Sequence, residues 1–432
     1  MSNHAYESAA ALRPSSNGPI PISTLCERFS LAPASAEDAA ALNDLSILGV
    51  SVDSADTAPG ELFVGLPGFT VHGARFAADA VASGAVAVLT DADGAQIVHQ
   101  TAPGTPTLVH SDPRAVVGPL SAEVYHHPAR GLVTTAVTGT NGKTTTAYFL
   151  DAILSAHVGG CMVAGTVELR VGERSVESPR TTVEAPVLQR MMALAVEDKV
   201  GAASLEASSH AIVLHRLDGI VVDVAGFTNL QRDHLDFHKT MEGYLEAKAQ
   251  LFTPEHARRG VVCVDDQWGA ALAAEAPIEI DRVRAYPGDT PADWWVSDAA
   301  VSLTDSATTF TLHGPDGEQI EASCPLPGLV NVQNAALALV MAIRAGVPAA
   351  TATAALAGAH NIPGRMQRIS QRDGQRGLCI VDFAHTPDAM ELALKAVRPI
   401  TPGRLIVVFG SDGDRDQGKR PMLGEVCARL AD

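Results

Sequence analysis

The chain has 432 residues, of which 46% are hydrophobic, and a formal net charge of −18 at pH 7. This length exceeds what one hydrophobic core normally organises, so we expect about two to four domains. The acidic balance argues against nucleic acid or an anionic membrane as a general partner, because either would select a basic surface. Small molecules or other proteins are therefore the expected partners.

No stretch approaches the roughly 18 apolar residues of a membrane-spanning helix, so we expect no membrane insertion. The polar start "MSNHAYESAAALRPSSNG" is unlike a signal peptide, and a cytoplasmic protein is expected. The cysteines are scattered without close pairs, which favours reduced core residues over a disulfide framework or a thiolate zinc site. They are Cys26, Cys161, Cys263, Cys324, Cys379 and Cys427.

Alternating strand and helix patterns predict an α/β fold in three modules. In the first, residues 61–68, 74–84 and 85–91 read as strand, helix and strand, and we place this domain at 1–130. The second domain, 131–362, begins with the apolar run "GLVTTAV" and continues through further strands and helices. Its last helix is predicted at 331–347. Pro363 and Gly364 then indicate a hinge.

We expect a third domain at 363–432, of which this sequence contains only a part. Residues 377–385 and 404–413 are predicted as buried parallel strands, with a helix at 387–398 between them. The chain then stops after another helical stretch. Because a parallel sheet normally needs helices on both faces, we expect that the chain is cut inside this domain.

The stretch "TGTNGKTTT" at 138–146 lies between a predicted strand and a predicted helix, which favours a phosphate-binding loop. Val137 stands where a strict Walker A pattern has glycine, so the standard pattern does not match. Gly139 and Gly142 still let backbone amides curve around an anion, Lys143 supplies positive charge, and Thr144 offers a hydroxyl to Mg²⁺. The alternative is a glycine-rich turn without a ligand.

Carboxylate and imidazole side chains follow two later strands. Glu206 ends a predicted strand, where nucleotide-binding folds commonly place a carboxylate near Mg²⁺. The stretch "RDHLDFH" brings Asp233, His234, Asp236 and His238 together. Alone it is consistent with a metallohydrolase site or with a polar surface loop, and a metal or phosphate role for His234 stays open on the pattern.

Lys248 falls on the apolar stripe of a predicted helix at 241–252. A lysine in such a position normally extends its ammonium group to the surface, and this is the default expectation from the pattern. The alternative is burial, which would lower its pKa and leave a neutral amine that can be modified or act as a base.

Taken together, the motifs resemble the Mur ligase family, over nearly the whole chain, and most of all its members that add the third residue of the peptidoglycan stem peptide. The resemblance rests on their order and spacing. They are "GTNGKTTT", "RTTVEAP", "EASSHAIVLHRLDG", "FTNLQRDHLDFH", "YLEAKAQLF", "LPGLVNVQN", "IPGRMQR", "VDFAHTPDAM" and "FGSDGDRDQGKRPM".

The resemblance implies a three-domain architecture with a phosphate-loop central domain and a Rossmann-like C-terminal domain, here incomplete. It implies an ATP-dependent, ADP-forming ligase that joins a diamino acid to UDP-N-acetylmuramoyl-L-alanyl-D-glutamate through an acyl phosphate. It also implies a monomer, two Mg²⁺ sites and a carbamate on Lys248. The choice between meso-diaminopimelate and L-lysine would depend on a C-terminal segment that we expect to be absent.

The resemblance also assigns roles to residues of this sequence. Nucleotide contacts would come from Gly139, Thr140, Asn141, Gly142, Lys143, Thr144, Thr145, Asn331, Asn334, Arg365, Asp382 and His385. Metal contacts would come from Thr144, Glu206, His234 and Lys248; of these, Glu206, His234 and Lys248, with Lys143, form the implied catalytic set. Substrate contacts would come from Ser54, Thr181, Thr182, Ser208, Arg216 and, for the incoming amino acid, Arg415.

Three positions depart from the family pattern near the implied substrate pocket: Ala55 where an arginine is usual, Val183 where a proline is usual, and Leu214 where relatives carry a polar residue. They leave other functions to weigh. These are a different Mur or folylpolyglutamate-type ligase, a catalytically silent nucleotide-binding protein, and a metallohydrolase, the last of which leaves the glycine-rich loop unexplained.

Overall fold

The computed structural model describes residues 11–302, 307–359, 362–370, 377–411 and 418–432. By its internal contacts the chain divides into two compact units. The first comprises Met1–Thr134, Val158–Asp223 and Gln250–Arg258, and the second comprises Thr135–His157, Val224–Ala249 and Arg259–Asp432. Among the described residues, no helix combines the length and apolar character needed to cross a membrane.

The N-terminal part of the first unit contains a five-stranded sheet in the order β2-β7-β6-β5-β4. Strands β4 to β7 are mutually parallel, and β2 joins the edge antiparallel to β7. The strands are β2 (Ala32–Pro33), β4 (Gly49–Ser51), β5 (Glu61–Val64), β6 (Ala87–Thr90) and β7 (Thr107–Val109). The two predicted strands of this module are confirmed. The helix predicted at 74–84 is a 3₁₀ turn, η3 (Gly73–Phe76), followed by α3 (Ala77–Ala82).

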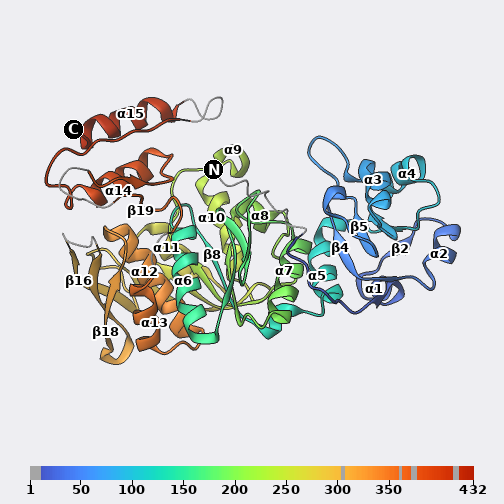
Figure 1. The fold of residues 1–432 in the computed structure, drawn as a ribbon, viewed down its shortest axis with the longest axis horizontal. Coiled ribbons are helices and arrows are strands. Elements are labelled where there is room, and N and C mark those ends of the chain that lie inside the picture. Colours follow the sequence, from blue (N-terminus) through green and yellow to red (C-terminus); the bar gives the residue numbers. More distant parts are fainter. Residues whose placement is uncertain (1–10, 303–306, 360–361, 371–376, 412–417) are drawn as a thin grey trace. The chain divides into compact units, whose positions relative to one another are not determined.

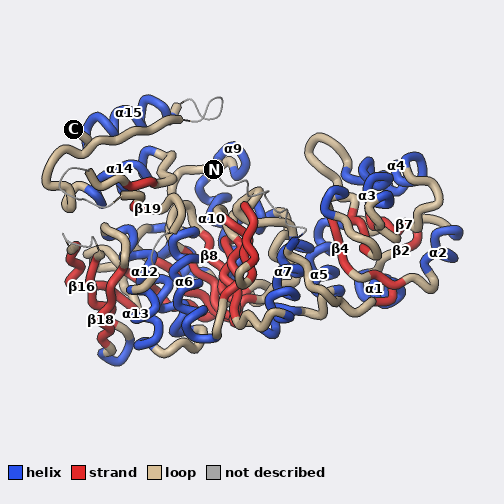
Figure 2. Tube along the Cα trace, viewed as in Figure 1, coloured by secondary structure: helices blue, strands red, loops and turns tan. Residues whose placement is uncertain are grey.

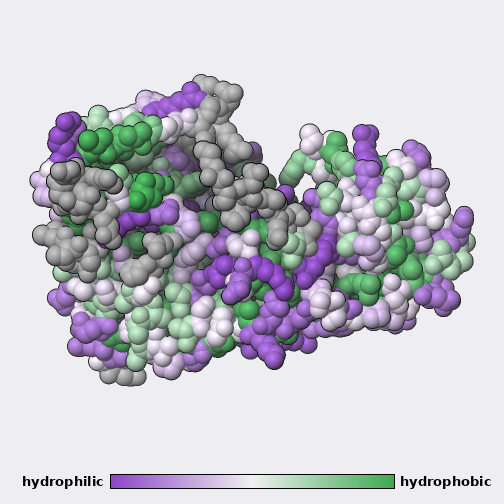
Figure 3. All heavy atoms as spheres, viewed as in Figure 1, coloured by the Kyte–Doolittle hydropathy of each residue, from purple (hydrophilic) through white to green (hydrophobic). Residues whose placement is uncertain are grey.

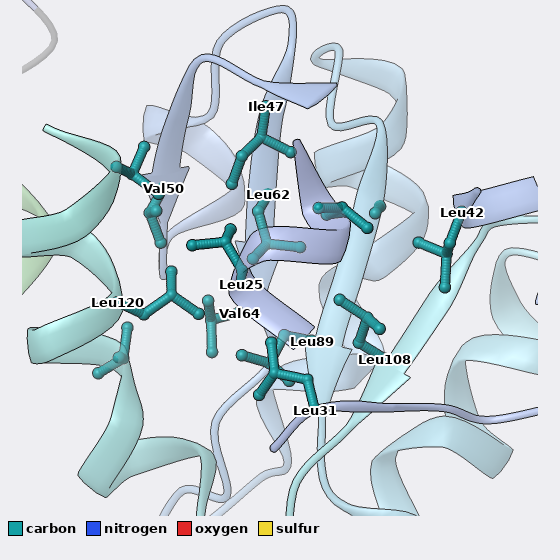
Figure 4. Close-up of a cluster of buried hydrophobic side chains, with 14 of the residues drawn as sticks. Leu25, Leu31, Leu42, Ile47, Val50, Leu62, Val64, Leu89, Leu108 and Leu120 are labelled. Atoms are coloured by element: carbon teal, nitrogen blue, oxygen red, sulfur yellow. The ribbon is translucent and has the colours of Figure 1, made fainter. Parts of the chain in front are cut away.

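Helices cover both faces of this sheet (Figure 1). Because side chains alternate along a strand, Leu62 and Val64 enter one core and Phe63 enters another. The first core packs α1 (Ile22–Phe29) and α5 (Pro113–Val124) on the sheet, and Figure 4 shows most of its buried side chains. The second packs α3 and α4 (Ala92–Thr101) on the opposite face. The shorter elements nearby are β1 (Ile20–Pro21), α2 (Ala36–Leu42), β3 (Ser46–Ile47), η2 (Ser54–Asp56) and η4 (Pro128–Gly131).

The rest of the first unit contributes four strands in the order β11-β10-β9-β12. Strands β9 and β12 are parallel, whereas β10 pairs antiparallel with both β9 and β11. The strands are β9 (Cys161–Ala164), β10 (Glu168–Val171), β11 (Arg174–Glu177) and β12 (Ala202–Glu206). Helix α7 (Ala185–Glu197) contacts β9 and β10, and the short α8 (Ser209–Val213) follows β12.

The second unit contains, wholly or mainly, the strands in the order β8-β13-β14-β15-β16-β17-β18. They are β8 (Val133–Thr138), β13 (Val222–Phe227), β14 (Ala257–Cys263), β15 (Glu279–Arg284), β16 (Trp294–Val301), β17 (Thr308–His313) and β18 (Gln319–Cys324). Pairs β8–β13, β14–β15 and β15–β16 are parallel, and β16 to β18 form an antiparallel meander.

Helices α12 (Leu329–Arg344) and α13 (Ala349–Ala357) pack on that meander, and Figure 2 shows them beside β16 and β18. The helix predicted at 331–347 is therefore confirmed as α12, but α13 follows it, so α12 is not the last helix before the predicted hinge. The remaining elements are α6 (Lys143–Val158), α9 (Leu235–His238), α10 (Met241–Ala249), η5 (Gln250–Phe252), α11 (Gln267–Glu275) and η6 (Pro315–Gly317).

The C-terminal segment differs from its prediction. Helices α14 (Pro387–Val397) and α15 (Lys419–Leu430) pack together through Met390, Leu394 and Leu423. The predicted buried parallel strands are wrong in the described residues: Ile380–Val381 forms a two-residue strand, β20, antiparallel to β19 (Gln367–Arg368), and 404–410 forms no strand.

Val408 in that stretch is 95% exposed, and hydrophobic residues are visible on this C-terminal part in Figure 3. An apolar run becomes a buried strand only where neighbouring strands pair with it, and among the described residues none pairs with 404–410.

The cysteines only partly follow their prediction as core residues. Cys161, Cys263, Cys324 and Cys427 are buried, Cys26 is half-buried and Cys379 is exposed. Burial raises the pKa of the Cys324 thiol to about 12, which suits a residue that packs rather than reacts. Cys379 directly precedes the short strand β20.

Candidate functional site

A glycine-rich loop joins β8 to α6, as the sequence predicts. Gly139 and Gly142 have φ of 144° and 93°, values that residues with a side chain rarely adopt. A Cβ at Gly139 would collide with the Thr228 hydroxyl, and one at Gly142 would collide with the Asn334 amide oxygen. Only glycine fits at both positions. The loop therefore brings its backbone to the N-terminus of a 16-residue helix, where amide groups and the helix dipole favour an anion.

The segment after β13 holds this loop in shape. The Thr140 amide donates to the Asn229 carbonyl over 2.9 Å, and the Asn141 amide donates to the Asn229 side chain over 3.1 Å. The Thr228 hydroxyl donates to the Asn141 carbonyl over 2.6 Å, and the Asn141 side chain donates to Gln231 Oε1 over 2.6 Å. Sequence reasoning missed the supporting roles of Thr228, Asn229 and Gln231, although the polar run after an apolar strand is a usable signal.

Two lysines contact the loop. Lys143 Nζ donates to the carbonyls of Gly139 and Thr140 over 3.0 and 2.9 Å. Lys248 Nζ donates to the same Gly139 carbonyl over 2.8 Å and lies 4.4 Å from the centre of the Tyr244 ring. The side chain of Lys248 is buried, so the default from the helix pattern is wrong and the alternative, burial, is confirmed. Burial also agrees with the interior position that the family resemblance implies. It shares the buried face of α10 with Tyr244 and Ala247.

Burial gives Lys248 unusual acid–base properties. Desolvation lowers the pKa of its amine well below the ordinary value, and the nearby Lys143 charge lowers it further, against a smaller opposing effect of Asp233. A lysine in this state carries an amine that is neutral at a lower pH than usual. The site thus holds a buried lysine that loses its proton more readily than usual, beside a phosphate-binding turn.

The acidic and histidine cluster lies next to Tyr244. His234 is 47% exposed at its side chain, has a left-handed backbone with φ of 53°, and places Nε2 3.5 Å from Asp233 Oδ2. Its ring centre lies 6.1 Å from that of Tyr244, on which His238 stacks at 4.9 Å. Among the described residues, no group of three or more histidine, cysteine or acidic side chains is placed to hold a metal ion.

The predicted nucleotide residues beyond the loop separate into three places. Asn334 is buried against Gly142, and its Oδ1 has no hydrogen-bond partner among the described residues. Asn331 instead donates to the Pro327 carbonyl at the start of α12. Arg365 donates to the Thr144 hydroxyl over 3.0 Å, which brings a residue from the far end of the chain to the first turn of α6.

Asp382 and His385 lie near the loop that carries Arg365. Asp382 accepts hydrogen bonds from the amides of Met366 and Ala384, over 2.8 and 2.9 Å. His385 is exposed, and its Nδ1 lies 2.9 Å from the Phe383 carbonyl. The Arg365 guanidinium packs 4.9 Å from the centre of the Phe383 ring. Arg415 lies outside the described residues.

In the first unit, Glu206 ends β12 with its side chain buried. Its two carboxylate oxygens accept from the Thr166 amide over 2.8 Å and from the Thr166 hydroxyl over 3.0 Å. A Cβ at Gly165 would collide with the same carboxylate, so glycine is needed there. Sequence reasoning missed Gly165 and Thr166; the signal was a small residue and a hydroxyl directly after the buried strand β9.

Four predicted substrate residues gather around Glu206. The Thr181 hydroxyl lies 3.2 Å from the Thr166 hydroxyl. The Thr182 hydroxyl donates to the Glu206 carbonyl over 2.7 Å and accepts from the Ser208 amide over 3.0 Å. Arg216 donates to the Thr182 carbonyl over 3.0 Å and pairs with Glu184 at 2.9 Å.

Arg216 has unused hydrogen-bonding capacity. Its Nε is buried and has no partner among the described residues, and burial lowers the pKa of its guanidinium. An unpartnered buried donor carries a desolvation cost that an anionic ligand would remove. Ser54 lies apart from this group, at the start of η2 after β4, where Asp53 caps the turn by accepting from the Ala55 amide.

The side chains that could bind a metal are few, and they fit Mg²⁺ better than a metal that takes all of its ligands from the protein. Mg²⁺ typically takes only one or two protein carboxylates, together with phosphate oxygens and water. Each unit offers one ligand of this kind: the buried carboxylate of Glu206 in the first and the hydroxyl of Thr144 in the second. In the second unit, the glycine loop offers backbone amides to phosphate.

A strand, a glycine turn and a lysine at the first position of the next helix define an α/β protein of the phosphate-binding class. Family models agree and are more specific. The Mur ligase middle domain matches residues 137–342, the Mur ligase glutamate ligase domain matches 364–432, and the Mur ligase family catalytic domain matches 46–123.

Curated relatives match most of the chain. UDP-N-acetylmuramoyl-L-alanyl-D-glutamate--2,6-diaminopimelate ligase of Streptomyces avermitilis is 45% identical over 90% of this chain and 75% of its own length. UDP-N-acetylmuramyl-tripeptide synthetase of Leifsonia xyli subsp. xyli is 42% identical over 98% of this chain and 81% of its own length.

A solved structure of a UDP-N-acetylmuramoyl-L-alanyl-D-glutamate--2,6-diaminopimelate ligase superposes with a TM-score of 0.69 at 32% identity, covering 90% of this chain and 77% of that one. The chain belongs to the Mur ligase family.

Proposed function

We propose that this protein is an ATP-dependent, ADP-forming ligase that joins a diamino acid to UDP-N-acetylmuramoyl-L-alanyl-D-glutamate during peptidoglycan biosynthesis in the cytoplasm. The names of its relatives support this substrate pair, and the diaminopimelate ligases among them favour 2,6-diaminopimelate over L-lysine. The observation that carries the proposal is Lys248, a buried amine on the carbonyl of the phosphate-binding turn. Nucleotide binding alone does not require a buried lysine at this position.

The ATP phosphates are proposed to lie on Gly139 to Thr145, with Lys143 leaving its two carbonyl partners to face the terminal phosphates. Asn334 supports this assignment because its buried Oδ1 has no hydrogen-bond partner among the described residues, and a nucleotide or a bound water could provide one. Arg365, already on the Thr144 hydroxyl, would neutralise phosphate charge. Asn331, Asp382 and His385 are proposed to contact the nucleotide as well.

The muramyl dipeptide is proposed to bind at Thr181, Thr182, Ser208 and Arg216. Its carboxylates would be held by hydroxyls and by Arg216 Nε, which has no partner in the part of the chain that the structure describes. Ser54 would contact the uridine diphosphate end, and Arg415 the incoming amino acid. Thr144, Glu206, His234 and a modified Lys248 would hold two magnesium ions. When bound, these ions would supply charge neutralisation for phosphoryl transfer.

Lys248 is proposed to carry a carbamate. Its neutral amine would attack carbon dioxide, forming an N–C bond and losing one proton, and the product is a carboxylate with two oxygens. This chemistry explains why a lysine is buried where a free ammonium would be unfavourable. It also turns a group that would repel a cation into one that can bind it.

The reaction needs two transfers that balance without a further cofactor. The substrate carboxylate attacks the γ-phosphate of ATP, giving ADP and an acyl phosphate. The amino group of the diamino acid then attacks the acyl carbon, releasing phosphate and a proton and forming an amide. The residues of this chain bind, orient and shield the acyl phosphate from water, which accounts for most of such a catalyst's effect.

We further propose three domains at 1–130, 131–362 and 363–432, and a monomer. The ranges of the three family models support these domain boundaries.

The test of function is ADP release by the purified chain with the UDP-muramyl dipeptide, offering diaminopimelate and L-lysine separately. Release that requires ATP, the dipeptide and one diamino acid supports the proposal. ADP release that is the same with and without the muramyl dipeptide overturns the substrate assignment.

A further inference from the structure

A wholly buried arginine joins two segments of the first unit. Arg190, on α7, is 1% exposed; its Nη1 donates to Asp56 Oδ2 over 2.9 Å and its Nε to the Leu12 carbonyl over 3.2 Å. Arginine is almost never fully buried unless it is paired. Removing one partner of such a pair leaves the other charge unsatisfied in a region of low polarity, so the geometry is strongly enforced.

The network extends beyond this pair. Arg13 donates to the Asp56 carbonyl, lies 3.4 Å from Asp56 Oδ1 and pairs with the buried Glu61. Glu61 in turn accepts from the Ala58 amide over 2.9 Å. Charges of opposite sign therefore alternate from Arg190 to Asp56, Arg13 and Glu61. Together these side chains bind both backbone and side-chain atoms of residues 56–61.

The Arg190–Asp56 ion pair joins α7 to η2. The proposed function assigns the segment before α7 to the dipeptide end of the substrate and η2 to its uridine diphosphate end. Asp56 is the last residue of η2, which begins with Ser54. Helix α7 begins at Ala185, directly after the Thr181 and Thr182 segment that contacts Glu206 and Ser208. None of the residues in the ion-pair network is itself assigned to substrate.

We propose that Arg190 is a positioning residue that sets the spacing between the segment holding the nucleotide-diphosphate end and the segment holding the dipeptide end of the substrate. The inference rests on the proposed function. A ligand held at both ends gains affinity from the second anchor only when the spacing of the anchors matches the ligand. The rigid, planar guanidinium of Arg190 and its burial keep that spacing constant before the substrate arrives.

The test compares two ligands on the whole chain. Calorimetry measures the dissociation constants of UDP-N-acetylmuramoyl-L-Ala-D-Glu and of N-acetylmuramoyl-L-Ala-D-Glu, which lacks the uridine diphosphate. Their ratio reports the benefit of the second anchor and needs no turnover. In Arg190→Met we expect this ratio to fall by about 10-fold or more, because the second anchor is misplaced. A role in stability alone would lower the melting temperature and leave the ratio unchanged.

Two further variants keep the result interpretable. Asp56→Asn keeps the side-chain shape but removes the negative charge that pairs with Arg190. If Arg190→Met does not fold, the ratio of the two dissociation constants in Asp56→Asn tests the inference instead. Arg344→Met is the matched control, because it removes an arginine paired with the buried Asp281 at 2.8 Å, and neither residue is assigned to substrate. Its ratio should equal that of the parent.

An unchanged ratio in a folded Arg190→Met or Asp56→Asn variant overturns the inference, as does a parent protein without preference for the UDP-bearing ligand. A parent that binds neither ligand instead refutes the proposed function, and the inference falls with it.

Discussion

Lys248 and Glu206 are two ionisable side chains buried to the same degree, one in each unit, and their surroundings treat them in opposite ways. Glu206 accepts two hydrogen bonds from Thr166, one for each carboxylate oxygen. Lys248 has a carbonyl partner and an aromatic face, but its pKa is lowered by burial and by the neighbouring Lys143.

The comparison shows that the partners of a buried group decide its chemistry. A carboxylate that accepts two directed hydrogen bonds is held in one orientation and can serve as a fixed ligand. A buried amine is instead pushed towards its neutral form, first by desolvation and then by a neighbouring cation, and the neutral form is the one that can react. Four experiments can break or sharpen this contrast.

The largest effect is expected at Lys248. Lys248→Met should lower ADP release by at least about 10²–10³-fold, as loss of a charged group at a phosphoryl-transfer site does. Carbon-13 NMR of the parent in ¹³C-bicarbonate should show a carbamate resonance that this variant lacks. Lys395→Met, which removes an exposed lysine paired with Glu391, should keep both the resonance and the activity. A parent without the resonance would refute the carbamate.

Gly142→Ala tests whether the loop tolerates any side chain. Its Cβ would collide with Asn334 and its φ is positive, so we expect ATP binding about 10²-fold weaker, as a displacement of about 1 Å can cause. Gly104→Ala is the control for strain: φ is +81° there, but a Cβ would meet nothing within 4 Å. Both variants should lose about 1–2 kcal/mol of stability from the backbone alone, and equal ATP affinity in the two would contradict the collision.

Thr166 tests the other half of the comparison. Thr166→Val keeps the shape and the backbone amide but removes the hydroxyl bond to Glu206, so the Mg²⁺ concentration for half-maximal ATP turnover should rise about 10-fold. Thr166→Ser keeps the hydroxyl and should restore the parent value. A similar loss in both variants would mean that the methyl group, and not the hydrogen bond, matters.

The smallest effect is on stability against pH in bicarbonate-free buffer. Because the pKa of Lys248 is lower in the folded than in the unfolded state, the unfolded chain binds more protons between the two values, and stability rises with pH through that window. Lys248→Met should remove this rise. Its stability advantage over the parent should therefore shrink as the pH rises towards the ordinary pKa of lysine, about 10.4. Parallel urea-midpoint curves would contradict the lowered pKa.

Local patterns in the sequence were sufficient for the loop and much of the α/β core. The strands and helices around the loop have the apolar periodicity of their elements, and Gly139, Gly142 and Lys143 are neighbours in the chain. The same reasoning was wrong for residues 404–410, whose apolar pattern predicts a buried strand but which have no pairing strand among the described residues. A strand depends on its neighbours in space, and periodicity carries no information about them.

The sequence by itself determined the family, the α/β class and the phosphate-binding turn, because each depends on residues close together in the chain or on a recognisable order of motifs. Only the tertiary structure decided that Lys248 is buried, that Thr166 orients Glu206 and that Arg190 holds Asp56. These contacts join residues 40 to 134 positions apart. Their energies come from burial and hydrogen-bond geometry, which exist only once the chain has folded and brought the partners together.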